Sequence, residues 1–197
     1  PYSLVTLGYS PLTMTFLALV RHGETNWNLH GRLQGSSDIP LNDTGRAQAR
    51  EAGYELEFRT WDHLVSSPLV RAAETADIIG THLGLNRTAE FPDLAERHFG
   101  DAEGFTDWDA YSHWPDGRYP GLEPRSNLIV RGVRAVDEIA SRYPDSAVIA
   151  VAHGGVIRAI FDAIRRRHSP RILNAGVSTL EHDGTRWTVR TINGVAV

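Results

Sequence analysis

The apolar run FLALV (residues 16–20) decides the fold, because it leads directly into the polar residues Arg21 and His22. Two other apolar runs end in the same way: residues 63–65 precede SSP (66–68), and residues 147–152 precede HGG (153–155). Runs that are apolar throughout, rather than at every second position, are typical of strands covered on both faces. We therefore predict a parallel sheet with polar residues where its strands end.

Helical patterns separate these runs. The cluster NDT (residues 42–44) offers an N-cap for a helix that we predict to reach about residue 59. Apolar stripes with helical spacing predict three further helices, within residues 69–83, 129–143 and 157–164. Strands that alternate with helices predict an α/β fold, a three-layer α/β/α sandwich with a mostly parallel central sheet.

Two segments depart from this alternation. Residues 177–180 and 186–191 lie on either side of HDG (182–184) and predict a terminal hairpin. Residues 99–124 show no periodic pattern. Irregular stretches of that length in a compact domain usually act as lids or binding loops, and we expect one here.

Composition excludes several classes of function. The 197 residues include no cysteine, so disulfide scaffolds, thiolate metal sites and cysteine catalysis are excluded. Twenty basic and 24 acidic residues give a net charge of −4, which creates no basic field for nucleic acid or an anionic membrane. The run RRR (165–167) fits a helix C-terminus, where cations are favoured. We expect neither a nucleic-acid nor a membrane partner, and composition leaves the oligomeric state open.

The only methionine, Met14, directly precedes the first predicted strand. Residues 1–13 carry no charged side chain and therefore lack the basic segment of a secretory signal. We expect Met14 to be the natural initiator, residues 1–13 to be an upstream or cloning-derived extension, and residues 14–197 to form a single domain. A genuine N-terminal extension is the alternative. The missing secretory signal favours a cytoplasmic location.

The polar residues at the predicted strand ends form one candidate site. Ligands of open α/β sheets bind beyond the carboxyl ends of the strands. That placement brings together two arginines and two histidines, namely Arg21, His22, Arg71 and His153. The helix N-termini that follow the strands add backbone N–H groups and a positive dipole end. Such a cluster suits a tetrahedral dianion, and we predict a phosphate site.

The sequence around these residues resembles the histidine phosphatase superfamily, which includes the cofactor-dependent phosphoglycerate mutases and many phosphomonoesterases. Five ordered blocks and a late motif carry the resemblance: LVRHGETNWN (19–28), GRLQG with DIPL and a glycine (31–45), SSPLVRAAETA (66–76), LAE with G and EG (94–104), VAHGGVIR (151–158) and NAGVS (174–178). The resemblance extends from about residue 15 to residue 193. It implies a phosphoglycerate mutase-like sandwich and a single histidine phosphatase domain.

The resemblance also implies a role for each matched residue. His22 is the expected nucleophile, which forms a phosphohistidine. Glu96 is the expected general acid for the leaving alcohol and then the base for water. Asp93 and Glu103 are rival acids near Glu96, but Glu96 fits the spacing of the family. The remaining matched residues are expected to bind the phosphate: Arg21, Asn28, Arg71, His153 and Gly154. We expect no metal ion and no cofactor, because two arginines supply the positive charge.

Two departures favour a phosphatase over a mutase. The family's mutases carry a longer basic insertion after the acid motif, whereas residues 105–124 here contain four acidic residues and one arginine. The same stretch contains five aromatic residues, which either suit a partly apolar leaving group or only pack the lid: Phe105, Trp108, Tyr111, Trp114 and Tyr119. Gly155 stands where the mutases typically have asparagine.

A third departure concerns Leu122 and Pro124, which stand where many members have a glycine and a serine around Glu123. It leaves the substrate contacts of that loop open. We predict a metal-independent phosphomonoesterase that acts through a phosphohistidine on a small phosphorylated metabolite. The alternatives are a cofactor-dependent phosphoglycerate mutase and, more remotely, a non-catalytic phosphate-binding module.

Overall fold

The computed structural model describes residues 14–197, so the extension predicted at residues 1–13 lies outside the described residues. Seven strands form one sheet in the order β3-β2-β4-β1-β5-β6-β7. The strands are β1 (Thr15–Arg21), β2 (His63–Ser66), β3 (Arg87–Glu90), β4 (Ala147–Ala152), β5 (Val177–His182), β6 (Trp187–Ile192) and β7 (Val195–Ala196). Strands β3, β2, β4 and β1 are parallel neighbours, and β5, β6 and β7 extend the sheet in antiparallel fashion. The predicted parallel sheet and terminal hairpin are confirmed.

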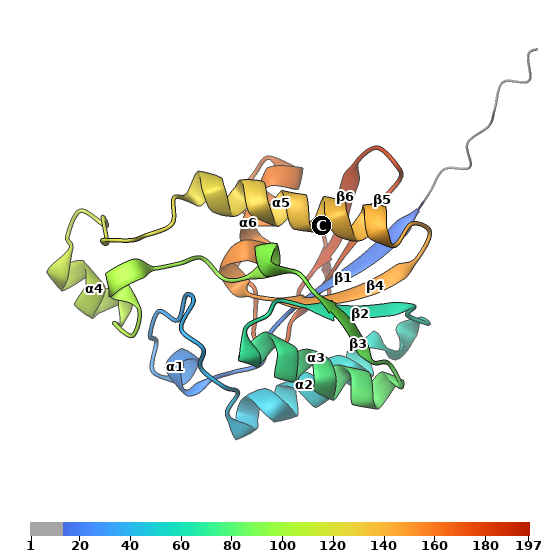
Figure 1. Cartoon of the computed structure of the whole chain (residues 1–197), viewed down its shortest axis with the longest axis horizontal. Helices are drawn as coiled ribbons and strands as arrows, with labels where there is room; N and C mark the ends of the chain where they lie inside the picture. Colours follow the sequence, from blue (N-terminus) through green and yellow to red (C-terminus); the bar gives the residue numbers. More distant parts are fainter. Residues whose placement is uncertain (1–13) are drawn as a thin grey trace, which may run out of the picture.

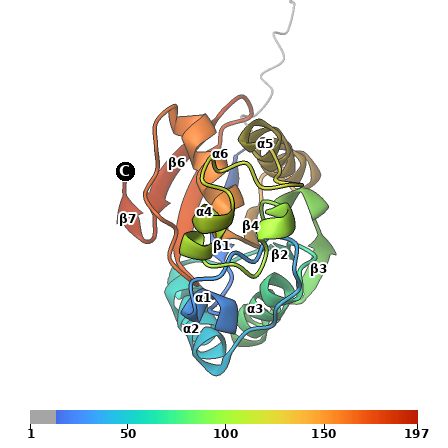
Figure 2. The ribbon, with the colours of Figure 1, turned by 90° about the vertical axis from the view of Figure 1, so that its left-hand side faces the viewer.

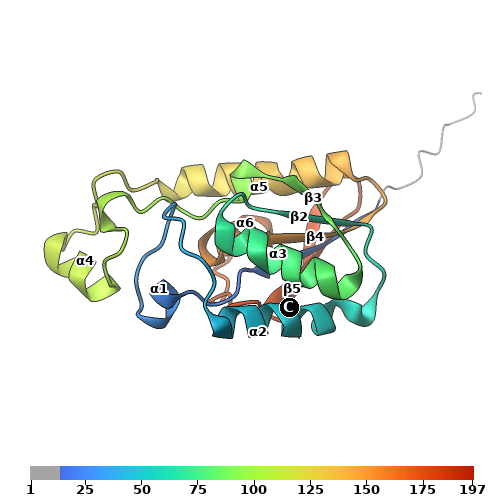
Figure 3. The same cartoon turned by 60° about the horizontal axis from the view of Figure 1, so that its bottom comes forward.

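Helices cover both faces of this sheet, as Figure 1 shows. Helices α2 (Asp43–Glu55) and α3 (Val70–Leu83) lie on one face, and α5 (Arg125–Arg142) and α6 (Gly154–Arg165) lie on the other. The view in Figure 3 brings α2 and α3 forward. The side chain of Asn42 caps α2 by accepting a hydrogen bond from the Gly45 N–H (2.8 Å), as its residue type predicts. The three-layer sandwich is confirmed.

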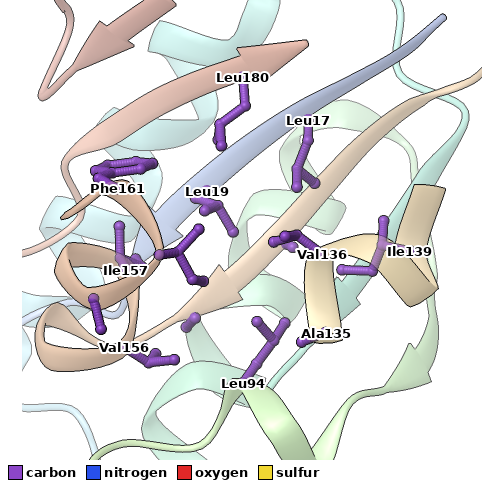
Figure 4. Packing of buried hydrophobic residues seen from close by; sticks show 14 of the residues in the cluster. Leu17, Leu19, Leu94, Ala135, Val136, Ile139, Val156, Ile157, Phe161 and Leu180 are labelled. Atoms are coloured by element: carbon purple, nitrogen blue, oxygen red, sulfur yellow. The ribbon is translucent and has the colours of Figure 1, made fainter. Parts of the chain in front are cut away.

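Burial on both sides explains why the first strand is apolar throughout. Leu17 and Leu19 pack towards α5 and α6, whereas Ala18 and Val20 pack towards α2 and α3. Figure 4 shows the first of these two clusters, with Leu17 and Leu19 beside side chains of both helices. Each fully buried leucine contributes about 2 kcal/mol through removal of apolar surface from water. This packing fixes where β1 ends and therefore where Arg21 and His22 lie.

The segment predicted to be irregular contains local structure, and the prediction was wrong in that respect. Helix α4 (Asp107–His113) begins after Thr106, whose hydroxyl accepts a hydrogen bond from the Asp109 N–H at 3.1 Å. The other short elements are α1 (Asn26–Leu29) and the 3₁₀ turns Leu56–Phe58, Pro92–Leu94 and Gly100–Ala102. Figures 1 and 2 show α1 and α4 together at one end of the molecule. Among the described residues, no helix is both long and apolar enough to cross a membrane.

Candidate active site

The site is built on the carboxyl ends of adjacent parallel strands. Arg21 pairs with Ala152 in the β1–β4 register, so the next residues, His22 and His153, lie beside each other. Their ring centroids are 5.1 Å apart. Arg71 reaches the same place from the first turn of α3, and all four predicted residues are buried. The structure therefore brings together the residues that the strand-end argument selected.

His22 has a defined tautomer. Its Nδ1 lies 2.6 Å from the carbonyl oxygen of Gly23, and because a carbonyl only accepts, Nδ1 carries the proton. Burial, followed by the charges of Arg71 and Arg21, lowers the pKa of His22 well below its ordinary value of 6.5. The ring is therefore neutral at physiological pH, with a free lone pair on Nε2.

Two buried guanidinium groups supply positive charge. Arg71 is fully buried, and its terminal nitrogens donate to the carbonyl oxygens of Ser37 and Gly35, each at 2.8 Å. Arg21 donates from Nη1 to the Ile172 carbonyl oxygen at 2.8 Å. Burial lowers the pKa of both arginines, that of Arg21 to about 10, so both remain charged at neutral pH. A cluster of two fixed cations and two neutral histidines favours a dianion.

Three nitrogens of the site lack a partner. Within residues 14–197, the buried side-chain nitrogen and oxygen atoms without a hydrogen bond are Arg21 Nε, Arg71 Nε and His153 Nδ1. An unpaired buried polar atom costs roughly 1–3 kcal/mol, and more when it is charged. All three belong to the predicted phosphate site, where an anion with several oxygens would satisfy them together.

His153 and Gly154 come from the junction between β4 and α6. His153 Nε2 lies 2.8 Å from the Ser67 hydroxyl, which fixes the ring and leaves Nδ1 as the unpaired atom. Burial, followed by the charge of Arg71, lowers the pKa of His153 well below 6.5. Gly154 begins α6 beside the Arg21 guanidinium, where an added Cβ would lie 3.2 Å from Nε.

Asn28 is oriented by its neighbours. Its Oδ1 accepts hydrogen bonds from the Thr25 N–H and from Asn174 Nδ2, both at 3.2 Å. Its side-chain Nδ2 makes no hydrogen bond within the described part of the chain and remains available as a donor. Asn174 also donates to the carbonyl oxygen of His22 at 3.2 Å. The sequence analysis placed Asn174 in a late motif but assigned it no role. Its hydrogen bonds join residues more than 140 positions apart, which no local pattern reveals.

Glu96 lies at the N-terminus of α6. Its Oε2 accepts a hydrogen bond from the Gly155 N–H (2.9 Å), and its Oε1 accepts one from the Arg97 N–H (2.8 Å). Its carboxylate opposes the lowering of the pKa of Arg21 and Arg71, which places it within electrostatic range of both guanidiniums. A carboxyl group held here is able to exchange a proton with a group bound between the arginines.

The rival acids are engaged elsewhere. Asp93 forms an ion pair with Arg134, at 2.9 Å between Oδ1 and Nη2. Glu103 accepts hydrogen bonds from Ser36, Ser37 and Phe99. Burial raises the pKa of Glu103, but the hydrogen bonds from Ser37, Ser36 and Phe99 outweigh burial and hold the pKa below its ordinary value. The contacts therefore favour Glu96 over both rivals.

One ion pair between α5 and the end of the segment 99–124 was missed by the sequence analysis. Arg131 Nε donates to Glu123 Oε1 at 2.7 Å and Nη2 donates to Oε2 at 2.9 Å. The same guanidinium donates to the carbonyl oxygens of Asp93, Ala95 and Glu96. Arg131 thus braces the segment that carries Glu96. No short motif reveals this, because Arg131 reaches carbonyl groups of residues 93–96, which lie more than 30 residues away in the sequence.

Within residues 14–197, no group of three or more histidine, aspartate or glutamate side chains is placed to hold a metal ion. The positive charge of the site comes from Arg21 and Arg71. 

Comparison with known proteins identifies the family of this chain. The family model of the histidine phosphatase superfamily (branch 1) matches residues 17–194. The chain is 40% identical over 184 residues to the uncharacterized phosphatase PhoE of Bacillus subtilis, which covers 91% of this chain and 95% of PhoE. It is 35% identical to the metal-independent phosphoserine phosphatase of Arabidopsis thaliana, over 93% of this chain and 83% of that protein.

A solved structure shares the whole architecture. The mycobacterial glucosyl-3-phosphoglycerate phosphatase in complex with VO3 superposes with a TM-score of 0.82 and 31% sequence identity, over 90% of this chain and 98% of that chain. The family model extends from within β1 to residue 194, directly before β7, and therefore includes the helices and strand ends that carry the site. This chain belongs to the histidine phosphatase superfamily.

Proposed function

We propose that this chain is a phosphoric monoester hydrolase that acts through a phosphohistidine at His22 on a small phosphorylated substrate. The observation that carries the proposal is the set of three unpaired nitrogens around a neutral histidine with a free Nε2. Phosphatase relatives support the reaction class. The relatives' substrates, phosphoserine and glucosyl-3-phosphoglycerate, support a small phosphorylated metabolite.

In the first step, His22 Nε2 attacks the phosphorus atom. An N–P bond forms, and the bond between phosphorus and the alcohol oxygen breaks. Glu96 enters this step protonated and donates that proton to the alcohol oxygen, so the product leaves as a neutral alcohol. Arg21, Arg71 and His153 bind the equatorial oxygens, where negative charge spreads in the transition state. For His153 to donate from Nδ1 to the phosphoryl group, its Nε2 accepts the hydroxyl hydrogen of Ser67, whose oxygen lies 2.8 Å away.

In the second step, water replaces His22. Glu96, now a carboxylate, accepts a proton from the attacking water, an O–P bond forms and the N–P bond breaks. His22 returns to its neutral form and inorganic phosphate remains between the arginines. The hydrogen bond from Nδ1 to the Gly23 carbonyl oxygen holds the ring in the same orientation through both steps. The enzyme therefore needs no group beyond its own side chains.

The direct test is hydrolysis of p-nitrophenyl phosphate after exhaustive dialysis against EDTA. We expect full activity, because the fixed charges come from arginine rather than from a metal ion. Loss of activity that a divalent ion restores would contradict metal independence. Absence of activity with and without metal would leave the phosphate-binding module as the better account, provided that orthovanadate still binds.

The structure gives residue 155 a local reason to be glycine. A Cβ at this position would overlap Glu96 Oε1, so the asparagine typical of the mutases does not fit this placement of Glu96. This supports hydrolysis over the mutase reaction. A coupled assay with 3-phosphoglycerate and its bisphosphate tests the alternative, and we expect phosphate release rather than isomerisation.

The aromatic residues of segment 105–124 support only part of the prediction that the leaving group is partly apolar. Phe105, Trp114 and Tyr119 contact one another, with ring centroids 5.5 Å apart in both pairs, so these three aromatics pack the lid. Trp108 and Tyr111 are exposed on α4. A partly apolar leaving group therefore stays a prediction, which a panel of alkyl, sugar and amino-acid phosphates tests. A cytoplasmic location likewise stays a prediction, which cell fractionation tests.

A further inference from the structure

We propose that Glu103 is a positioning residue that sets the place of Arg71 through the backbone of residues 35–37. Glu103 comes directly after the 3₁₀ turn Gly100–Ala102. Arg71 lies on α3, and both side chains make hydrogen bonds with the loop of residues 35–37. The inference rests on the proposed function, since it concerns how the phosphate-binding arginine is held.

The first half of the connection is a carboxylate surrounded by donors. Glu103 Oε1 accepts hydrogen bonds from the Ser36 N–H (2.9 Å) and the Phe99 N–H (3.1 Å). Glu103 Oε2 accepts from the Ser37 N–H (2.9 Å) and the Ser37 hydroxyl (2.6 Å). The Ser36 hydroxyl adds a further bond to Oε1 at 3.1 Å. Two consecutive peptide units are thus fixed by one side chain that is only 12% exposed.

The second half joins the same peptide units to Arg71. The guanidinium donates from Nη2 to the Gly35 carbonyl oxygen and from Nη1 to the Ser37 carbonyl oxygen, both at 2.8 Å. These bonds occupy the outer edge of the guanidinium and leave Nε unpaired within the site. The Ser36 and Ser37 N–H groups therefore hold the loop on Glu103, while its carbonyl groups hold Arg71.

The loop is shaped for this contact. Gly35 has a φ of +54°, and a Cβ there would overlap the Glu103 carboxylate. Asp38 accepts a hydrogen bond from the Val70 N–H at 2.7 Å, which joins the end of the loop to the first turn of α3. The loop is therefore tied on one side to Glu103 and on the other to the helix that carries Arg71. A shift of the carboxylate would move both carbonyl acceptors of the guanidinium.

The resemblance left Glu103 as a possible acid, and the geometry assigns it another task. All the hydrogen-bond partners of its two oxygens are donors, so an ionised carboxylate is the form that fits, and a protonated or amide group would place O–H or N–H against them. A residue that acts through Arg71 should alter phosphate binding only while Arg71 is present. That requirement distinguishes positioning from a general effect on the fold.

The test is a double-mutant cycle read by orthovanadate inhibition of p-nitrophenyl phosphate hydrolysis, with vanadate binding measured calorimetrically for slow variants. The variants are Glu103→Gln, Arg71→Ala and the double variant. Loss of charge-assisted hydrogen bonds predicts ~10–100-fold weaker vanadate binding for Glu103→Gln. In the Arg71→Ala background, the same change should weaken binding by less than about 3-fold, because the residue through which it acts is gone. 

Two further variants distinguish a positioning effect of Glu103 from a general effect of lost charge or lost folding. Asp101→Asn removes an exposed carboxylate from the same 3₁₀ turn, and it should leave vanadate binding unchanged. Ser37→Ala removes one bond and keeps the backbone N–H, and it serves if Glu103→Gln fails to fold. Its smaller loss should likewise disappear without Arg71.

The outcomes are distinct. The positioning role is overturned if Glu103→Gln binds vanadate as tightly as the wild type. It is also overturned if Glu103→Gln weakens vanadate binding equally in the presence and in the absence of Arg71. A wild-type protein that neither hydrolyses p-nitrophenyl phosphate nor binds vanadate overturns the proposed function instead. Non-additivity with intact wild-type activity supports both.

Discussion

Glu96 and Gly155 fit together because position 155 has no side chain. The Gly155 N–H donates to Glu96 Oε2 at 2.9 Å, and a Cβ at this position would overlap Oε1. The N-terminus of α6 thus holds the proposed general acid by a backbone donor and a favourable dipole. The same turn follows His153, so one helix end places two groups of the site.

We predict that Gly155→Ala displaces Glu96 and slows turnover. Misplacement of a reacting group by about 1 Å costs up to ~10²-fold in rate, so kcat/KM for an alkyl phosphate should fall by ~10–100-fold. Stability should not fall in parallel, because alanine is favoured over glycine in a helix by about 1 kcal/mol. Steady-state kinetics and thermal unfolding check both parts. Unchanged turnover of the alkyl phosphate would show that Glu96 does not need this placement.

Replacement of the acid itself should depend on the leaving group. Glu96→Gln should slow an alkyl phosphate by ~10²–10⁴-fold, because an alkoxide leaves poorly without a proton. Cleavage of p-nitrophenyl phosphate should be affected far less in its first step, since p-nitrophenolate leaves unprotonated. A burst of p-nitrophenol before slow turnover is expected if water attack becomes limiting.

The matched control for that variant is Asp93→Asn. Asp93 lies three residues away and forms an ion pair with Arg134, whose side chain is exposed. We expect less than about 3-fold change with either substrate, because such pairs contribute little. If Glu96→Gln slowed both substrates equally and without a burst, the acid would have to be sought among Asp93 and Glu103.

Protonation of the buried histidines predicts how stability depends on pH. The pKa values of His22 and His153 are lowered by burial and by Arg71, whereas the unfolded chain takes up these protons near pH 6.5. Below pH 6.5 the unfolded state therefore binds more protons, and the free energy of unfolding falls as the pH falls. Each histidine contributes a slope of up to about 1.4 kcal/mol per pH unit, and above pH 6.5 this contribution is complete.

Urea unfolding between pH 7.5 and 5 measures that slope. His153→Asn should show a shallower loss of stability with falling pH than the wild-type chain, since one of the two protonation sites is removed. Equal slopes in the two proteins would mean that His153 is already protonated in the folded state.

The sequence predicted those parts of the site that depend on apolar runs, strand ends and local helix caps. The run FLALV identified β1 because both faces of that strand are covered, and the end of the run placed His22 at the sheet edge. The meeting of His22 with His153 followed from the rule that parallel strands share their carboxyl edge. The NDT cluster likewise located the start of α2, since Asn42 caps the helix by a local bond.

Other features depend on tertiary contacts that no local pattern reports. The strand β3 (Arg87–Glu90) is short, lies at the sheet edge and alternates half-buried with exposed residues, so it has no apolar run. Helix α4 was missed because it is short, and its residues Trp108 and Tyr111 are exposed. The contacts of Glu103 with residues 36 and 37 join positions more than 60 residues apart, and only the structure separates that carboxylate from Glu96.

The central claim is that His22 carries the phosphoryl group, and trapping the phosphoenzyme tests it most directly. The enzyme is mixed with a ³²P-labelled phosphomonoester and quenched in alkali. The protein is then digested, and the labelled peptide is identified. We predict a label on His22 that is stable in alkali and lost in acid, absent from folded His22→Ala and retained in His168→Ala, whose side chain is fully exposed. An acid-stable label, or an acid-labile label that persists in His22→Ala, would contradict the account.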